Sequence, residues 1–130
     1  GWYLLGGYEM VNAEAAFRKE LDAWLEKGVT CPFIFTEYGC DHLVGEHKLP
    51  SVQWSVEYEQ EYLDMYHRVF DSYECIKGEQ VWNFADFQTV EGIMRVNGNK
   101  KGIFTRQRQP KETAFYFKKR WESLPVDYKG

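Results

Sequence analysis

The stretch Pro32-Phe33-Ile34-Phe35-Thr36-Glu37-Tyr38-Gly39 decides the fold class, because its apolar run closes on a carboxylate and then a glycine. The run from Pro32 to Phe35 is typical of a buried strand in a parallel sheet. A charged side chain at the carboxyl end of such a strand emerges at the rim where parallel α/β barrels place their chemistry. Glu37 is therefore the first candidate catalytic residue.

Helical patterns flank this strand on both sides. Asn12 is a candidate N-cap for a helix over 13–27, which Gly28 ends. Apolar residues at spacings of three and four predict a second helix over 56–72. We expect the charged residues of this second helix to form a solvated face.

The remaining elements follow the same alternation. A second strand is predicted over 79–84, and Pro110 fits the first turn of a last helix over 111–124. The residues expected on the inner face of that helix are Ala114, Phe117, Trp121 and Leu124. The order of helix, strand, helix, strand, helix favours an α/β fold with parallel strands and crossover helices.

The length of 130 residues is that of one domain, and no boundary is predicted within residues 1–130. A closed (β/α)₈ barrel typically needs ~250 residues, so the chain is expected to be part of one. No apolar stretch is long enough for a membrane span, and no targeting segment is recognised.

Charge and cysteine content narrow the function classes. The net charge of −4 argues against a generic nucleic-acid surface, which needs clustered Lys and Arg. The three cysteines cannot all pair within the chain, so a reducing compartment such as the cytoplasm is expected.

A polar cluster after the first strand raises the question of a metal site, and its members are Cys40, Asp41, His42, Glu46 and His47. The two histidines are five residues apart in a segment that contains glycine, and no second cysteine completes a Cys-x-x-Cys pair. A polar loop beside Glu37 is the favoured interpretation, and no metal is expected.

Four longer segments together resemble a known family: residues 35–39 (FTEYG), 63–71 (LDMYHRVFD), 78–87 (GEQVWNFADF) and 97–106 (NGNKKGIFTR). In this order they are similar to the carboxyl-terminal part of the β-glucuronidases of glycoside hydrolase family 2. The likeness extends from Gly1 to Trp121. It implies that the two strands are about the seventh and eighth of a TIM barrel.

The resemblance also implies that Glu37 is the nucleophile of a retaining glycosidase. Such enzymes pair two carboxyl groups roughly 5 Å apart, one attacking the anomeric carbon and the other acting as acid and then base. In the family the acid/base glutamate follows an asparagine, and no Asn-Glu pair occurs in this chain. We therefore expect residues 1–130 alone to be inactive.

The segment after the turn Asn97-Gly98 has two interpretations. The plain one is a solvated hairpin tip, because Asn-Gly is a strong turn signal. In an extended segment, however, Asn99 and Lys101 point to one side while Lys100 points to the other. The resemblance assigns Asn99 and Lys101 to the C6 carboxylate of the sugar.

Other candidate substrate-binding residues are Arg95, Trp82 and Tyr3. Arg95 would assist the carboxylate contact, and Trp82 would form a wall of the sugar pocket, although it could instead fill the barrel core. Tyr3 is a candidate hydroxyl donor near Glu37, as is Tyr38. Neither Glu79 nor Asp86 is expected to be catalytic.

The expected partner is therefore a small-molecule glucuronide, with no cofactor, and the resemblance implies a homo-tetrameric parent. Two alternatives remain open. One is a related family 2 activity, a galacturonidase or β-galactosidase, and the other is a non-catalytic carbohydrate-binding module.

Overall fold

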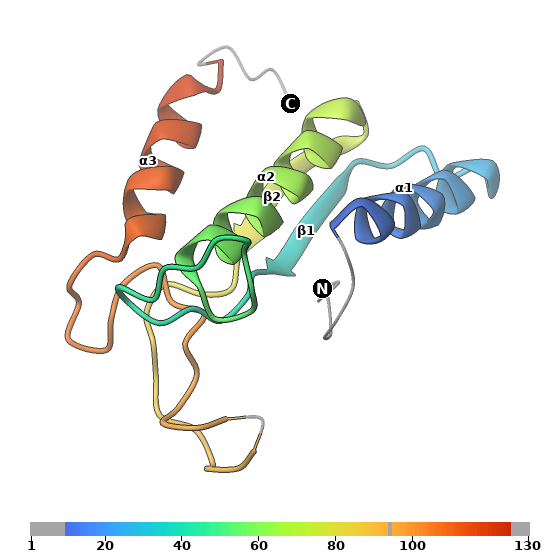
Figure 1. The fold of residues 1–130 in the computed structure, drawn as a ribbon. Helices are drawn as coiled ribbons and strands as arrows, with labels where there is room; N and C mark the ends of the chain where they lie inside the picture. Colours follow the sequence, from blue (N-terminus) through green and yellow to red (C-terminus); the bar gives the residue numbers. More distant parts are fainter. Residues whose placement is uncertain (1–9, 94, 126–130) are drawn as a thin grey trace.

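The computed structural model describes residues 10–93 and 95–125, which form three helices and two parallel strands. In chain order these are α1 (Met10–Glu26), β1 (Phe33–Tyr38), α2 (Val56–Ser72), β2 (Ile76–Val81) and α3 (Glu112–Ser123). The two strands pair directly, and α2 is the crossover between them (Figure 1). The predicted α/β class and the order of the elements are confirmed.

Helix α2 has the bounds expected from its periodicity. Ser55 caps it, since its hydroxyl accepts a hydrogen bond from the Tyr58 N–H at 3.2 Å. Tyr62, Tyr66 and Phe70 follow at intervals of four and are all buried. The helix contacts both α1 and α3, so it is the central helix of the covering layer (Figure 1).

An aromatic core lies between β1 and the helices. The ring of Tyr38 stacks on Tyr66 at 5.4 Å and meets Phe70 edge-on at 5.1 Å. Phe17 of α1 meets Phe35 at 5.2 Å, and Phe117 of α3 meets Tyr38 at 6.4 Å. Rings from each helix therefore hold β1 in place, and such pairs add about 0.5–1.5 kcal/mol each beyond simple burial.

The start of α1 differs from the prediction. The helix begins at Met10, and Asn12 lies exposed inside it instead of capping it. Met10 packs against the core, so burial of its side chain favours a longer helix than the capping preference suggests. Gly28 ends the helix as expected, with φ +79° and its N–H bonded to the Leu25 carbonyl at 2.9 Å.

The second strand also lies earlier than predicted, over Ile76–Val81 instead of 79–84. The Trp82 N–H still bonds to the Tyr38 carbonyl at 2.8 Å, but the Asn83 N–H bonds to the Lys101 carbonyl at 3.0 Å. The aromatic run after Val81 is thus paired with a loop, which sequence periodicity does not distinguish from a strand. In β1, the regular pairing is interrupted after Phe35 and resumes at Tyr38.

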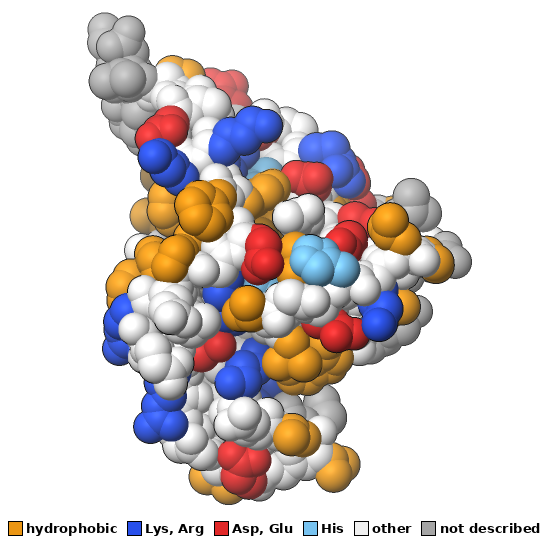
Figure 2. Space-filling view, turned by 60° about the vertical axis from the view of Figure 1, so that its left-hand side comes forward, with side chains coloured by type: hydrophobic (Ala, Val, Ile, Leu, Met, Phe, Trp, Pro, Cys, Tyr) orange, Lys and Arg blue, Asp and Glu red, His pale blue; other side chains and the backbone are white. Residues whose placement is uncertain are grey.

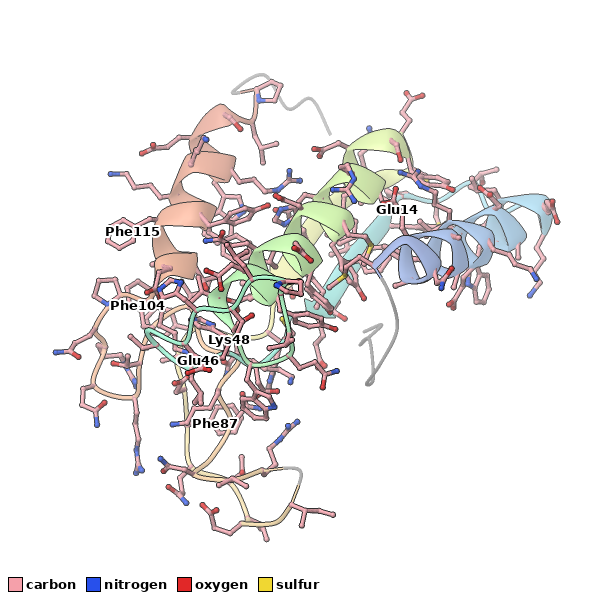
Figure 3. The ribbon with its side chains drawn as sticks, viewed as in Figure 1. Glu14, Glu46, Lys48, Phe87, Phe104 and Phe115 are labelled. Atoms are coloured by element: carbon pink, nitrogen blue, oxygen red, sulfur yellow. The ribbon has the colours of Figure 1, made fainter. Side chains whose placement is uncertain are left out.

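Helix α3 begins at Glu112, one residue later than predicted, and Lys111 is its N-cap residue, so Pro110 precedes the helix. Phe117 is buried as expected, but Trp121 is 46% exposed, so the predicted inner face is only partly covered. Phe115 projects outward from the helix (Figure 3).

One face and one edge of the strand pair are uncovered. Ile34 alternates with the core residues Phe33 and Phe35 and is 61% exposed. A groove of about 590 Å³ runs between α1 and the free edge of β1. Apolar side chains also reach the surface among charged ones on the face shown in Figure 2. Two strands cannot close a barrel, so further strands would pack at the free edges of the strand pair.

Within the described ranges, no helix has the length and apolar character needed to cross a membrane.

Candidate active site

The site lies at the carboxyl ends of β1 and β2, where residues 39–55 and 82–110 form long connections on the same end of the strand pair (Figure 1). The two strand ends approach closely at Gly39. A Cβ atom there would lie 2.3 Å from the Trp82 carbonyl oxygen, and its φ is +154°. Glycine is therefore required to bring the end of Glu37's strand against Trp82.

Glu37 is half-buried and lies beside an irregularity in the strand pairing. Phe35 pairs with Glu79 and Tyr38 pairs with Val81, so β1 uses one more residue than β2 over this interval. Phe35 and Tyr38 consequently both pack into the aromatic core, although strict alternation would separate them. The bulge re-aims the side chains between them, as bulges near active sites commonly do.

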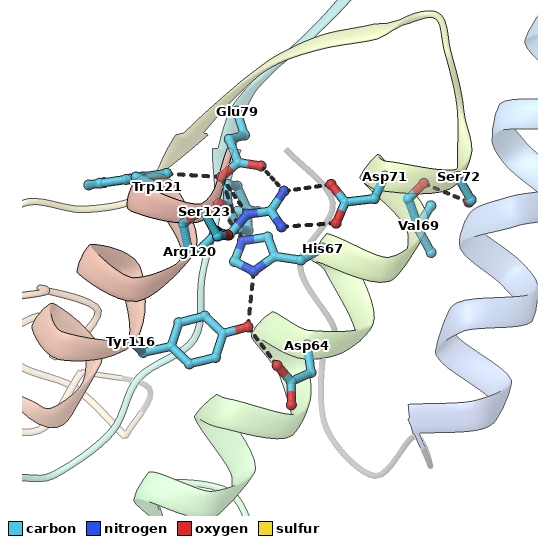
Figure 4. A network of polar contacts seen from close by, with 11 residues as sticks. Asp64, His67, Val69, Asp71, Ser72, Glu79, Tyr116, Arg120, Trp121 and Ser123 are labelled. Carbon is cyan, nitrogen blue, oxygen red and sulfur yellow. Dashed lines mark hydrogen bonds and ion pairs between the residues drawn. The ribbon is translucent and has the colours of Figure 1, made fainter. Parts of the chain in front are cut away.

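Tyr38 anchors the end of β1 by contacting a buried polar network, of which His67, Tyr116 and Asp64 are labelled in Figure 4. Its hydroxyl lies 2.9 Å from His67 Nε2, and His67 Nδ1 lies 3.0 Å from the Tyr116 hydroxyl. Tyr116 donates to Asp64 at 2.6 Å, so its oxygen accepts from His67 Nδ1–H. The Nε2 atom then accepts from Tyr38, which assigns the neutral Nδ1–H tautomer.

Burial explains why His67 stays neutral. Burial lowers its pKa to about 4, and the Arg120 charge contributes in the same direction. Burial also raises the pKa of Tyr38, so its hydroxyl keeps its proton. The expectation of a solvated charged face on α2 is wrong at this position, because the side chain of His67 faces the core.

Glu79 has a structural partner in Arg120 (Figure 4). Arg120 donates to both carboxylate oxygens of Glu79, at 2.9 and 2.7 Å, and also to Asp71. Burial alone would raise the pKa of Glu79, but the Arg120 hydrogen bonds and charge lower it overall. Glu79 thus ties β2 to α3.

Asn99 and Lys101 are largely buried and do not lie at a solvated hairpin tip. Asn97 and Gly98 have φ of +59° and +87°, as a tight turn requires. Asn99 is then 4% exposed, and the Lys101 side chain is 12% exposed. The Lys101 N–H donates to Asn99 Oδ1 at 2.9 Å, which brings the two predicted ligands together.

Asp41 joins two predicted cationic residues. Its Oδ2 forms an ion pair with Lys101 Nζ and lies 3.5 Å from Arg95 Nη1, while its Oδ1 accepts from the Lys100 N–H at 2.9 Å. Two cationic side chains and one carboxylate therefore lie together in this group. We define Asp41, Arg95, Asn99 and Lys101 as the carboxylate clamp.

Asp41 was missed as a site residue. The only sequence signal was its place four residues after Glu37 in a polar loop, where it was considered only as part of a metal cluster.

That cluster is dispersed in the structure. Asp41 pairs with Lys101, whereas His42 Nδ1 lies 2.6 Å from Glu59 Oε2 and His47 lies 2.7 Å from Glu57. Among the residues described, no group of three potential ligands is close enough to hold a metal ion. Glu59 is also buried, so the solvated charged face expected for α2 is wrong at this position too. Its carboxylate faces His42 in the loop that follows β1.

Trp82 follows β2 directly and is 38% exposed, with its ring edge-on to Phe87 at 6.2 Å. The peptide bond between Trp82 and Asn83 is cis. A hollow of about 410 Å³ lies nearby, but Lys100 lines it and Lys101 does not. Tyr3 lies outside the described residues.

Comparison with known proteins now decides the family. A family model described as "Glycosyl hydrolases family 2, TIM barrel domain" matches residues 4–126. The chain belongs to glycosyl hydrolase family 2. The predicted resemblance is thereby confirmed, and the α/β fragment is part of a TIM barrel domain family.

Relatives in family 2 share a name. The β-glucuronidase of Streptococcus agalactiae is 48% identical over 125 residues, which are 96% of this chain and 21% of that protein. The β-glucuronidase of Felis catus is 50% identical over 95 residues, which are 72% of this chain and 15% of that protein. The chain therefore spans about a fifth of the length of these family 2 relatives.

Solved family 2 structures share the fold. Lactobacillus rhamnosus β-glucuronidase matches with a TM-score of 0.91 and 62% identity, covering 100% of this chain and 22% of that chain. Ruminococcus gnavus β-glucuronidase in complex with D-glucuronic acid matches with a TM-score of 0.87 and 61% identity, covering 93% of this chain and 21% of that chain.

Proposed function

We propose that the full-length protein hydrolyses β-D-glucuronides to D-glucuronate and an alcohol, with retention of anomeric configuration. The observation that carries this proposal is the carboxylate clamp at the carboxyl ends of the strands. Its Lys101 is largely buried, and Lys101 and Arg95 both lie beside the Asp41 carboxylate, so two cationic side chains converge at one place. The relatives named β-glucuronidase, one of them in complex with D-glucuronic acid, support the same substrate class.

In this reaction the Glu37 carboxylate attacks the anomeric carbon, and the bond to the leaving oxygen breaks as that oxygen receives a proton. A second carboxyl group donates the proton and later deprotonates the water that releases the sugar. That group is proposed to lie outside these 130 residues, so this segment alone should show no turnover.

The remaining roles follow from position. Asn99 and Lys101 would bind the C6 carboxylate with help from Arg95, while Trp82 and Tyr3 would line the sugar pocket. β1 and β2 would be strands seven and eight of the barrel. The parent would be a homo-tetramer in a reducing compartment, the cytoplasm, which suits the free thiols of Cys31, Cys40 and Cys75.

The test is Lys101→Ala in the full-length protein, assayed on an aryl glucuronide and on the matching glucoside. Loss of the Lys101 ammonium should lower kcat/KM for the glucuronide about 10³-fold, because its carboxylate loses a cationic partner. For the glucoside, which has no carboxylate, kcat/KM should fall less than about tenfold. Lys100→Ala is the matched control, because alternation along an extended segment predicts that its side chain points to the other side. Equal losses on both substrates would overturn the assignment.

The same assay separates the alternatives. A galacturonide differs from a glucuronide only at C4, so its carboxylate would use the same clamp. Higher turnover of the galacturonide would favour a galacturonidase, and higher turnover of a galactoside would favour a β-galactosidase. Binding of glucuronate without any turnover would favour a carbohydrate-binding module.

A further inference from the structure

Lys111 is a buried cation that the proposed reaction does not use. Its side chain is 0% exposed, and its Nζ lies 2.8 Å from Asp86 Oδ1. The same Nζ donates to the Lys100 carbonyl at 2.9 Å and to the His42 carbonyl at 3.4 Å. One ammonium therefore contacts the residue before Lys101 and the residue after Asp41, which are the two ends of the clamp's ion pair.

Asp86 completes this arrangement on the other side of Lys101. Its Oδ1 accepts a hydrogen bond from the Gly102 N–H at 3.0 Å. A Cβ atom on Gly102 would lie 2.1 Å from the Asp86 backbone nitrogen, so only glycine permits this approach. The Lys111–Asp86 pair thus binds the backbone on both sides of Lys101.

The backbone of Lys101 itself is also fully engaged. Its carbonyl accepts from the Asn83 N–H at 3.0 Å, and its N–H donates to Asn99 Oδ1 at 2.9 Å. These bonds tie the position of the Lys101 side chain to the position of the segment. A shift of the segment would therefore move the Lys101 ammonium directly.

We propose that the Lys111–Asp86 pair is a positioning pair that sets the substrate specificity of the clamp by fixing where the Lys101 ammonium lies. This inference rests on the proposed function. Two buried charges are not a strong source of stability, because their desolvation offsets most of their attraction. Supporting groups around a binding site, in contrast, hold its ligands within the tolerance that recognition needs.

The first variant is Lys111→Met in the full-length protein, assayed with an aryl glucuronide and the matching glucoside. A displaced Lys101 should raise KM for the glucuronide about tenfold or more, with kcat changed less than about threefold. The glucoside, which has no carboxylate, should change less than about threefold in kcat/KM. Equal effects on both substrates would overturn the inference.

A double-mutant cycle with Lys101→Ala tests whether Lys111 acts through Lys101. Adding Lys111→Met to Lys101→Ala should change kcat/KM for the glucuronide less than about threefold, because the residue being positioned is already gone. Independent, additive losses would contradict a positioning role. The readout is specific, since a purely structural role would predict additivity.

Two further variants keep the test valid if Lys111→Met folds poorly. Asp86→Asn keeps an acceptor for the Gly102 N–H but removes the charge. It should therefore change the ratio of the glucuronide KM to the glucoside KM in the same direction as Lys111→Met. Leu21→Ala in α1 destabilises the core away from the site and should leave the ratio unchanged. If the wild-type protein hydrolyses no glucuronide, the proposed function fails. If the wild type is active and Asp86→Asn leaves the ratio unchanged, only the inference fails.

Discussion

The hydroxyl of Tyr38 lies 2.9 Å from Nε2 of His67, which joins the residue after Glu37 to the middle of α2. His67 is buried, and its pKa is lowered to about 4. The ring is therefore neutral throughout the neutral pH range, and its Nε2 can accept a hydrogen bond from the Tyr38 hydroxyl. This contact fixes the end of β1 independently of any substrate.

The lowered pKa of His67 predicts a pH-dependent stability. The unfolded state takes up the proton near pH 6.5 and the folded state only near pH 4, so stability is lost as pH falls between these values. The loss amounts to about 3 kcal/mol once pH is below both. Thermal melts of the full-length protein and of His67→Gln, compared at each pH from about 4 to 7.5, would measure it.

The comparison between the two proteins cancels the titration of groups that do not interact with the ring. His67→Gln should be less stable at neutral pH, where the ring's hydrogen bonds are lost, and the gap should narrow as the pH falls toward the folded-state pKa. A gap that stays constant with pH would contradict the assigned neutral ring.

Local rules predicted the parts of the fold that depend on neighbouring residues. Helix α2 has the predicted bounds because its cap and its apolar spacing agree. In contrast, the second strand was predicted too late in the chain, because Trp82 and Phe84 are residue types typical of strands. The segment instead pairs with the loop at Lys101, which is distant in sequence.

The close approach of the two strand ends predicts that Gly39→Ala is damaging. The new Cβ would meet the Trp82 carbonyl oxygen, which belongs to the backbone and cannot rotate away. We expect a loss of more than about 2 kcal/mol in stability, together with reduced glucuronide hydrolysis.

Gly28→Ala is the matched control for this change. Gly28 also has a positive φ, +79°, but a Cβ atom at this position would have no neighbouring atom within 4 Å. Its cost should be near 1 kcal/mol, roughly the strain of the backbone alone. Similar melting temperatures for the two variants would contradict the proposed clash.

Asp41 is predicted to orient the clamp cations. Asp41→Asn retains an acceptor for the Lys100 N–H but removes the charge that pairs with Lys101. The KM for an aryl glucuronide should rise about tenfold while the matching glucoside is unaffected. Asp22→Asn on α1 serves as the control. A lower KM in Asp41→Asn would instead mean that Asp41 competes with the substrate carboxylate.

The site was only partly predictable from the sequence. Side-chain alternation predicted that Asn99 and Lys101 lie on one side of an extended segment. The end of an apolar run predicted Glu37 as a candidate catalytic residue. Asp41 and Lys111 were not found, because both have partners far away in the chain: Lys101 lies 60 residues from Asp41, and His42 lies 69 residues from Lys111. The polar cluster around His42 had a plausible composition for a metal site, but its members have different partners in the fold.

The central claim is that Glu37 is the nucleophile, and Glu37→Gln in the full-length protein tests it most directly. The amide keeps the shape but cannot attack, so kcat on an aryl glucuronide should fall by about 10³-fold or more with the melting temperature little changed. Glu91→Gln, in the exposed loop, should behave as wild type. Near-normal turnover in a folded Glu37→Gln protein would contradict the account.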